Sequence, residues 1–288
     1  MNRFLKRHFN RFIPTAARDS IKRRVSRKFV SHATANLSVE ERSNALECTF
    51  RRDGIARSFL VPLDCRSAVA NLVATDEARV EFDSVVRAAE TGGCLFDIGA
   101  HSGLISAVFC AARTENTVVS FEPSPVLVER LSAIHDLNRF GQRMLIERIG
   151  IADENKTLQM LLDPAGGFVQ VQRFDHTMWA SPQIIDVPME TIEAAASRLQ
   201  VVPQFIKMDI ESYEFEAIKG SLEFLKQHKP IIFLELHLNY LEQRNLSIKQ
   251  VIEMLQSCGY NFYNSAGSPL KPRQMFDSLL PNIHLVVR

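Results

Sequence analysis

Acidic residues and a histidine stand at the ends of two predicted buried strands in the C-terminal half of this sequence. One strand ends at Asp209, and Glu211 follows two residues later. The other ends with Glu235 and His237, which share one face because alternate residues of a strand point the same way. Carboxylates and an imidazole at one edge of a sheet can take up a proton or hold a cation. We predict that Asp209, Glu211, Glu235 and His237 are catalytic.

A glycine-containing turn and an acid on the next strand point to a nucleoside-binding site. A predicted strand at 94–98 runs into the turn DIGAHSG at 97–103, where Gly99 lets the backbone approach a ligand closely. The helix that starts beyond this turn favours an anionic group at its N-terminus. Glu122 ends the next strand, where it can accept hydrogen bonds from both hydroxyls of a ribose.

The third strand of this series ends at IGIAD, residues 149–153, where the chain would pass the base of the nucleoside. We predict that Ile151 forms an apolar wall there and that Asp153 bonds an exocyclic amine. The first turn has the spacing D-x-G-x-x-x-G, unlike the G-x-G-x-x-G of dinucleotide sites. A nicotinamide-dependent oxidoreductase stays open as an alternative, because Glu122 could equally bind the ribose of NAD.

These motifs lie on short apolar strands that alternate with amphipathic helices from residue 92 onward. The alternation is typical of an α/β fold with a mostly parallel, doubly wound sheet and helices on both faces. The predicted strands are 94–98, 117–121, 143–149, 157–162, 184–188, 204–209, 230–236, 260–264 and 283–288. The predicted helices are 103–113, 125–138, 190–199, 213–227 and 247–257. We expect Glu214 and Glu216 to belong only to the start of the fourth helix, without a functional role.

Composition limits what else the chain could be. Hydrophobic residues make up 46% and charged residues 23%, which excludes a disordered or fibrous protein. Every apolar run is shorter than the roughly 18 to 20 residues needed to cross a bilayer. The five cysteines include no C-x-x-C pair, so we expect reduced core thiols and neither disulfides nor a zinc site.

The N-terminal segment differs in charge from the rest of the chain. Residues 1–28 contain ten Lys and Arg and a single acid, although the whole chain has a net charge of only +1. Apolar residues line one side of this basic amphipathic segment, so we predict peripheral contact of residues 1–30 with an anionic membrane surface. A mitochondrial transit peptide fits the same composition. Otherwise we expect a cytoplasmic protein without a nucleic-acid partner.

The chain divides into three parts on these grounds. The basic arm comes first. It is followed by a small segment with β structure and a helix over 75–90, and the catalytic domain comes last. The predicted boundaries are 1–40 for the arm, 41–90 for the lead-in segment and 91–288 for the catalytic domain.

Taken in order, the motifs resemble the FkbM family of S-adenosylmethionine-dependent methyltransferases. The matching blocks are DIGAHSG at 97–103, FEP at 121–123, IGIAD at 149–153, KMDIESYEFEAIKG at 207–220 and PIIFLELH at 230–237. The resemblance implies a class I, Rossmann-like methyltransferase fold with a seven-stranded sheet whose last strand is antiparallel. It also implies S-adenosylmethionine as cofactor and O-methylation of a hydroxyl group, on a sugar, glycolipid or polyketide-type natural product.

The resemblance and the motifs together predict the site. Asp209 and Glu211 would flank the reacting centre. Two mechanisms stay open: His237 or a carboxylate acts as general base, or Asp209 and Glu235 hold Mg²⁺, which would lower the pKa of the acceptor hydroxyl. The predicted cofactor contacts are Asp97, Gly99, Ala100, His101, Gly103, Glu122, Ile151 and Asp153.

Two residues depart from the family pattern. His101 stands where the family usually has Asn, and Ser212 stands where it usually has Gly. Ser212 lacks the freedom of glycine to adopt a positive φ, so we expect a rearranged loop there. These departures and the basic arm motivate a further alternative, a membrane-tethered binding module without turnover. We assign acceptor specificity to the loop 163–182, where Trp179 could stack on a sugar.

Overall fold

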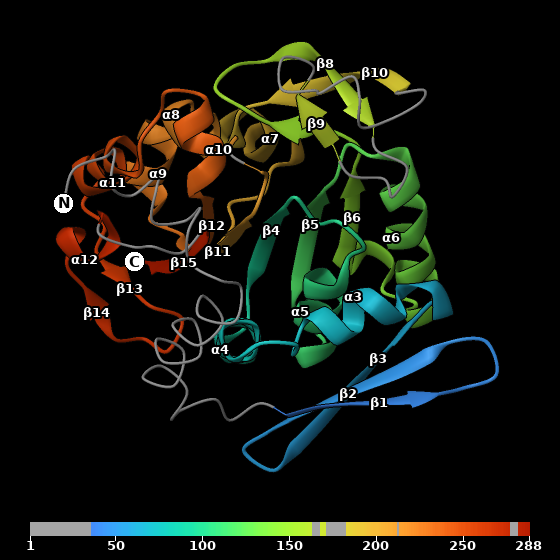
Figure 1. Ribbon diagram of the computed structural model, residues 1–288. Coiled ribbons are helices and arrows are strands. Elements are labelled where there is room, and N and C mark those ends of the chain that lie inside the picture. Colours follow the sequence, from blue (N-terminus) through green and yellow to red (C-terminus); the bar gives the residue numbers. More distant parts are fainter. Residues whose placement is uncertain (1–35, 163–167, 171–182, 212, 277–281) are drawn as a thin grey trace, which may run out of the picture.

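A mixed sheet forms the centre of the computed structural model, which describes residues 36–162, 168–170, 183–211, 213–276 and 282–288 (Figure 1). Eight described strands stand in the order β14-β13-β15-β12-β11-β4-β5-β6. Their bounds are β4 Cys94–Ile98, β5 Thr117–Phe121, β6 Met144–Glu147, β11 Phe205–Met208, β12 Ile231–His237, β13 Phe262–Tyr263, β14 Pro269–Leu270 and β15 Asn282–Val287.

The strand pairing is that of the predicted doubly wound sheet. The strands from β6 to β12 pair in parallel, whereas β15 pairs antiparallel with both β12 and β13. Within this sheet the first strand in chain order is β4, which lies in the middle. The strands β5 and β6 follow on one side of β4, and β11 and the later strands lie on its other side. Seven strands with an antiparallel last strand confirm the prediction, and the two-residue β14 extends one edge beside β13.

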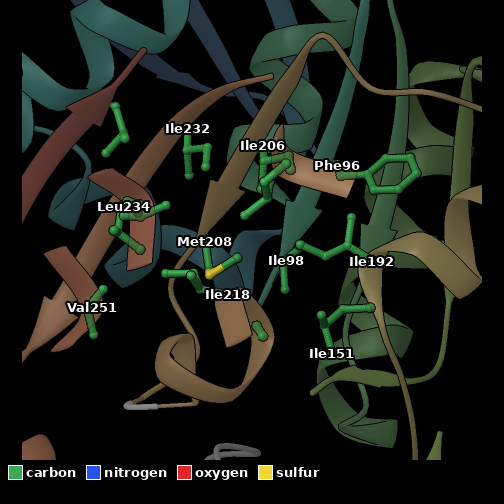
Figure 2. Packing of buried hydrophobic residues seen from close by; sticks show 14 of the residues in the cluster. Phe96, Ile98, Ile151, Ile192, Ile206, Met208, Ile218, Ile232, Leu234 and Val251 are labelled. Carbon is green, nitrogen blue, oxygen red and sulfur yellow. The ribbon is translucent and has the colours of Figure 1, made fainter. Parts of the chain in front are cut away.

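Alternating side chains of the strands enter two hydrophobic layers, one on each face of the sheet. Leu95 of β4 packs in the layer that contains Val108 of α5 and Leu131 of α6. The next residue, Phe96, packs on the opposite face in the layer that contains Ile192 of α7 (Figure 2).

The helices of the described residues are α3 Arg66–Asn71, α4 Asp76–Thr91, α5 Leu104–Ala112, α6 Pro125–Asn138, α7 Ile192–Leu199, α8 Glu214–Lys219, α9 Leu222–His228, α10 Leu238–Gln243, α11 Ile248–Ser257 and α12 Pro272–Phe276, with 3-10 helices η1 Leu63–Cys65 and η2 Gly141–Arg143.

The segment before β4 forms an antiparallel sheet and a helix. Strands β1 Asn36–Glu41, β2 Leu46–Arg52 and β3 Ile55–Val61 pair in chain order. Asp53 and Gly54 join β2 to β3, both with positive φ, as a two-residue type I′ turn requires. Thr75 caps α4 by accepting a hydrogen bond from the N–H of Ala78 at 3.1 Å. Phe50 and other apolar residues of this segment share one hydrophobic layer with α5 and α6.

A smaller sheet interrupts the alternation between β6 and α7. Its order is β7-β10-β8-β9, with bounds β7 Gly150–Ile151, β8 Lys156–Leu162, β9 Phe168–Gln170 and β10 Gln183–Glu190. Within the described ranges, no helix has the length and apolar character to cross a membrane. All five cysteines are buried and free, as predicted.

The prediction of one continuous helix over 213–227 is wrong. The chain forms α8 and α9, which are separated at Gly220 and Ser221. Gly220 lies against the backbone of Asp153, where a Cβ atom would come within 2.4 Å of the Asp153 Cα atom. This close approach to a neighbouring loop requires glycine, and glycine weakens the continuity of a helix.

Candidate functional site

The turn after β4 lies directly against the end of β11. Gly99 has a φ of 79°, and a Cβ atom there would lie only 2.0 Å from the carbonyl oxygen of Asp209. Only glycine permits this approach, because a side chain would collide with the backbone. The N–H groups of Gly99 and Ala100 both donate to the carbonyl oxygen of Phe121 at 3.0 Å, which ties the turn to β5. The predicted nucleoside turn and the acid Asp209 are therefore neighbours.

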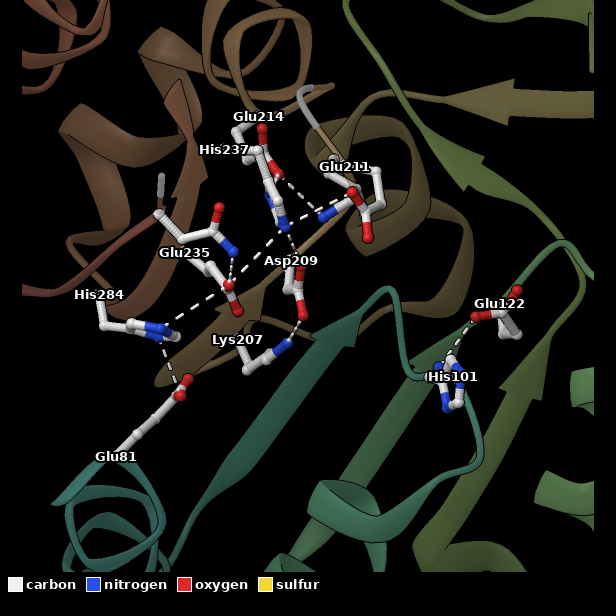
Figure 3. A network of polar contacts seen from close by, with 12 residues as sticks. Glu81, His101, Glu122, Lys207, Asp209, Glu211, Glu214, Glu235, His237 and His284 are labelled. Carbon is white, nitrogen blue, oxygen red and sulfur yellow. Dashed lines mark hydrogen bonds and ion pairs between the residues drawn. The ribbon is translucent and has the colours of Figure 1, made fainter. Parts of the chain in front are cut away.

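Glu122 follows β5 and faces the same turn. Its Oε2 accepts a hydrogen bond from the backbone N–H of His101, and its Oε1 accepts one from the N–H of Ser124, both at 2.9 Å (Figure 3). Burial raises the pKa of this carboxyl to about 7 in spite of the two hydrogen bonds. His101 has a φ of 51°, a left-handed conformation in which both His and Asn are enriched, so His at the family's Asn position suits this turn.

Three other predicted cofactor residues are buried in the interior. Asp97 is 1% exposed and accepts a hydrogen bond from Ser106 Oγ at 2.5 Å, and burial raises its pKa. A Cβ atom on Gly103 would lie 2.2 Å from Leu131 Cδ1, so this glycine lets the start of α5 pack against α6. Ile151 is 1% exposed and lies in the hydrophobic layer drawn in Figure 2.

Asp153 is held by two lysines. Lys156 Nζ lies 2.8 Å from one of its oxygens and Lys219 Nζ lies 3.2 Å from the other. Burial acts to raise the pKa of Asp153, but the hydrogen bonds from these lysines outweigh it and lower the pKa. The predicted cofactor residues that the structure brings together around one turn are Gly99, Ala100, His101 and Glu122.

Lys207, which we did not predict as a functional residue, holds the catalytic candidate Asp209. Its Nζ lies 2.8 Å from Asp209 Oδ2, and its side chain is only 9% exposed. Burial acts to lower the pKa of Lys207, but Asp209, Glu81 and Asp97 outweigh it and raise the pKa. Burial likewise acts to raise the pKa of Asp209, but Lys207 and His237 outweigh it and lower the pKa. Asp209 is therefore a fixed, ionised carboxylate.

The imidazole of His237 lies inside a group of four carboxylates. Its Nε2 is 3.5 Å from Glu211 Oε2, 3.7 Å from Glu235 Oε1 and 3.8 Å from Asp209 Oδ1 (Figure 3). Its Nδ1 is 3.6 Å from Glu214 Oε1. Burial acts to lower the pKa of His237, but Glu214, Glu211 and Asp209 outweigh it and raise the pKa to about 9. The four predicted catalytic residues, Asp209, Glu211, Glu235 and His237, do come together.

The two acids expected at a helix start do lie in the first turn of α8, and both have defined partners. Glu214 is completely buried, and its Oε1 accepts a hydrogen bond from the N–H of Ile210 at 3.0 Å. Glu216 forms a two-point ion pair with Arg244. Glu211 has a φ of 54°, a strained conformation for a residue other than glycine that is found preferentially at functional sites.

A second acid and histidine group lies beside Glu235. His284 of β15 faces Glu235 on one side and Glu81 of α4 on the other (Figure 3). Burial acts to lower the pKa of His284, but Glu81 and Glu235 outweigh it and raise the pKa to about 9. Glu81 and His284 could not be predicted from the sequence, because neither lies in a recognisable motif or beside another candidate residue. Lys207 did carry a signal, since it is the one charged residue in the buried strand β11.

Two triads have side chains close enough to hold a metal ion: Asp209, Glu214 and His237, and Glu81, Glu235 and His284. In both, the two ring nitrogens of the histidine face carboxylates of different residues. Within the described residues, Glu214 Oε2 and the Nδ1 atoms of His237 and His284 are buried without a hydrogen-bond partner. Because a metal-bound imidazole usually presents its second nitrogen to a carboxylate, both triads suit either a bound cation or protonated histidines that neutralise the surrounding acids.

The fold and the site define a class of protein. The strand order and the acid that follows the second parallel strand are those of a class I S-adenosylmethionine-dependent methyltransferase. The chain belongs to the FkbM methyltransferase family, because the family described as "Methyltransferase FkbM domain" matches residues 97–262, more than half of the chain. Membership implies S-adenosylmethionine as the cofactor. No curated protein matches the sequence.

Solved structures with similar folds include several methyltransferases. A methyltransferase FkbM from Methylobacillus flagellatus KT is 14% identical with a TM-score of 0.42, and the match covers 78% of this chain and 58% of that one. A SAM-dependent methyltransferase from Agrobacterium tumefaciens is 10% identical with a TM-score of 0.42, covering 86% and 70%. A precorrin-6y C5,15-methyltransferase from Geobacter metallireducens GS-15 is 11% identical with a TM-score of 0.37, covering 72% and 86%. The chain thus spans little more than half the length of the first of these structures.

Some predictions fall outside the described residues. They concern the basic arm over 1–35, Ser212, and the segments 163–167 and 171–182 of the proposed specificity loop, with Trp179.

Proposed function

We propose that this protein is an S-adenosylmethionine-dependent O-methyltransferase whose acceptor is a hydroxyl group of a sugar, a glycolipid or a polyketide-type product. The observation that supports this most directly is the contact between Gly99 and the carbonyl oxygen of Asp209. Because of this contact, the turn that we predict to bind the cofactor is next to the carboxylate and imidazole cluster. A donor and an acceptor bound on the two sides of this contact would be aligned for direct transfer, and alignment can contribute roughly 7 to 11 kcal/mol.

The surroundings of Glu122 fit the ribose of this cofactor. A carboxylate has about four lone-pair positions, and the N–H groups of His101 and Ser124 occupy two. The remaining positions can accept hydrogen bonds from two ribose hydroxyls. When bound, the cofactor supplies a methyl group that is already activated on a sulfonium. The protein must then orient the acceptor and remove its proton.

Glu211 is the best candidate for the general base. His237, with a pKa of about 9, is protonated at neutral pH, and the lowered pKa of Asp209 makes it a weak base. Burial and the neighbouring acids raise the pKa of Glu211, although His237 acts to lower it, so Glu211 is a better proton acceptor than Asp209. Its side chain is 59% exposed and can reach an acceptor. The alternative, Mg²⁺ held by Asp209 and Glu235, would make activity sensitive to EDTA.

Calorimetry with S-adenosylhomocysteine and with NAD tests the cofactor. We expect a binding heat with S-adenosylhomocysteine and none with NAD. Binding of NAD without binding of S-adenosylhomocysteine would instead support a nicotinamide-dependent oxidoreductase. Incubation with labelled S-adenosylmethionine and fractionated glycolipids then tests the reaction, and we expect one fraction to gain label. Binding of S-adenosylhomocysteine without transfer to any glycolipid or small-molecule fraction would support the inactive binding module. Full activity in EDTA would exclude the metal mechanism.

We further propose that residues 1–30 contact an anionic membrane surface, which would bring the enzyme to a lipid-linked acceptor. The basic composition of this segment supports the proposal. Sedimentation with phosphatidylserine vesicles should capture the full chain at low salt but not a chain that begins at residue 31. Equal capture of both chains would refute it.

A further inference from the structure

Three residues from outside the family-matched region surround Glu235. Glu81 lies in α4, and Asn282 and His284 lie in β15, whereas the family match covers residues 97–262. Asn282 Nδ2 donates a hydrogen bond to Glu235 Oε1 at 2.7 Å, and His284 Nε2 faces the same oxygen at 3.7 Å. On its other side, His284 Nδ1 lies 3.0 Å from Glu81 Oε2.

The fold explains how these residues meet. Glu235 and His284 are directly opposite in the antiparallel pairing of β12 and β15, so their side chains stand on the same face of the sheet. Phe233, two residues before Glu235 and therefore on the same face of β12, packs in one hydrophobic layer with Val86 of α4. The helix α4 thus covers this face. Glu81 therefore reaches His284 from the covering helix. The side chains of Glu81, Glu235 and His284 are 20%, 14% and 26% exposed, so water and salt screen their charges only in part.

The four residues Glu81, His284, Glu235 and His237 form a series in which acids and imidazoles alternate. Figure 3 shows the series running from α4 across β15 and β12 to the catalytic cluster. The two ring nitrogens of His284 lie within ion-pair distance of carboxylates of different residues, so the protonated ring attracts both acids. Its charge therefore holds Glu235 from one side while Asn282 holds it from another.

We propose that Glu81 and His284 are positioning residues of the active site: Glu81 fixes His284, and His284 with Asn282 fixes Glu235 against His237. The helix α4, which precedes the family-matched region, thereby becomes part of the catalytic machinery of this chain. The catalytic consequence rests on the proposed methyltransferase function. The arrangement of the side chains does not, so the two can be tested separately.

The arrangement is tested first without any acceptor. We would record the NMR signals of the histidine rings at one fixed pH in the wild type, Glu81→Gln, His284→Gln and Glu253→Gln. The control removes an exposed ion pair, in which Glu253 lies 3.4 Å from Lys249 on α11. We expect the His237 ring signals to move in Glu81→Gln and His284→Gln and to stay in Glu253→Gln. Unchanged His237 signals in both test variants would overturn the proposal.

The catalytic role is tested with the kinetics of methyl transfer. We expect kcat to fall about 10- to 100-fold in His284→Gln, because a shift of about 1 Å in a reacting geometry can cost 100-fold. KM and the affinity for S-adenosylhomocysteine should stay within about twofold, since neither residue touches the cofactor turn. Because Glu81 acts through His284, the double variant should be no slower than His284→Gln alone.

The kinetic results decide between a positioning role for Glu81 and His284 and no such role. Additive losses in the double variant, or a loss of cofactor affinity equal to the loss in kcat, would overturn the positioning role. Should His284→Gln fail to fold, Glu81→Gln decides, because it keeps the size of the side chain, and wild-type kcat in that variant would overturn the proposal. If the wild type binds no S-adenosylhomocysteine, the proposed function fails while the NMR result still decides the side-chain arrangement.

Discussion

Replacing Lys207 by Met should show how much of the protein's stability depends on one buried cation. Lys207→Met keeps an unbranched side chain that is one atom shorter and removes the charge that faces Asp209 Oδ2 at 2.8 Å. At an effective dielectric constant of about 20, two unit charges at this separation attract by about 6 kcal/mol, before the cost of desolvation is subtracted. Loss of one partner from a buried pair costs about 3 to 5 kcal/mol in measured cases.

The lower end of this range applies here. The side chain of Asp209 is 30% exposed, so water can solvate part of the carboxylate that the substitution leaves unpaired. We therefore expect Lys207→Met to lower the free energy of unfolding by about 3 kcal/mol at pH 7. For a domain of this size each kcal/mol corresponds to about 2 to 4 °C, so the Tm should fall by about 6 to 12 °C.

The effect should depend on pH in a defined direction. The pKa of Asp209 is lowered in the folded protein, so its contribution is present above the unfolded value of about 4 and is lost as the pH falls through the folded value. The pKa of Lys207 is raised, so its contribution is complete below about 10 and is lost only at higher pH. Between about pH 5 and 10 the difference between wild type and variant should be greatest, and it should shrink in more acidic solution.

Thermal and urea unfolding at pH 7 and at pH 3.5 would measure these differences. Lys219→Met is the matched control, because Lys219 is 56% exposed and lies 3.2 Å from Asp153. An exposed pair of this kind contributes below about 1 kcal/mol. The reasoning is refuted if Lys207→Met loses no more stability than Lys219→Met, or if its loss is the same at both pH values.

Three further changes have defined outcomes. Glu122→Gln should weaken S-adenosylhomocysteine binding roughly tenfold in calorimetry, since a hydrogen bond to a charged acceptor contributes about 1.5 kcal/mol more than one to a neutral acceptor. In the wild type the same affinity should fall as the pH drops below about 7, where Glu122 takes up a proton, and a flat profile would contradict this. Glu211→Gln should lower kcat by about 100- to 10,000-fold, whereas Glu216→Gln should retain most of the wild-type kcat, and equal rates in the two variants would exclude Glu211 as the base. Gly220→Ala should lower stability by about 1 to 3 kcal/mol in thermal unfolding, because the new Cβ atom would lie 2.4 Å from the Asp153 Cα atom, and an unchanged Tm would show that the loop yields freely.

The proposed active site draws on more of the sequence than the family-matched region. Glu81 and His284 lie on either side of residues 97–262, yet both stand beside Glu235. We infer that family members with a different N-terminal segment would have to hold the corresponding acid in another way.

The sequence alone determined the alternation of strands and helices and the edge at which the candidate catalytic acids lie. Apolar residues repeat with the period of the element that buries them, and parallel strands end at the same edge of a sheet. For this reason Asp209, Glu211, Glu235 and His237 could be predicted to lie together from their positions after β11 and in β12.

Only the tertiary structure decided which charges face one another. Lys207 and Asp209 are close in sequence, but the burial that makes their pairing strong comes from the strands and helices around them. Glu81 and His284 meet because α4 packs over β15, although about 200 residues separate them. Periodicity reports that a side chain is buried and on which face, but it does not report what lies across the interface. The partner is set by packing between distant segments, and in this protein that packing links α4 to the cluster of acids and histidines around Glu235.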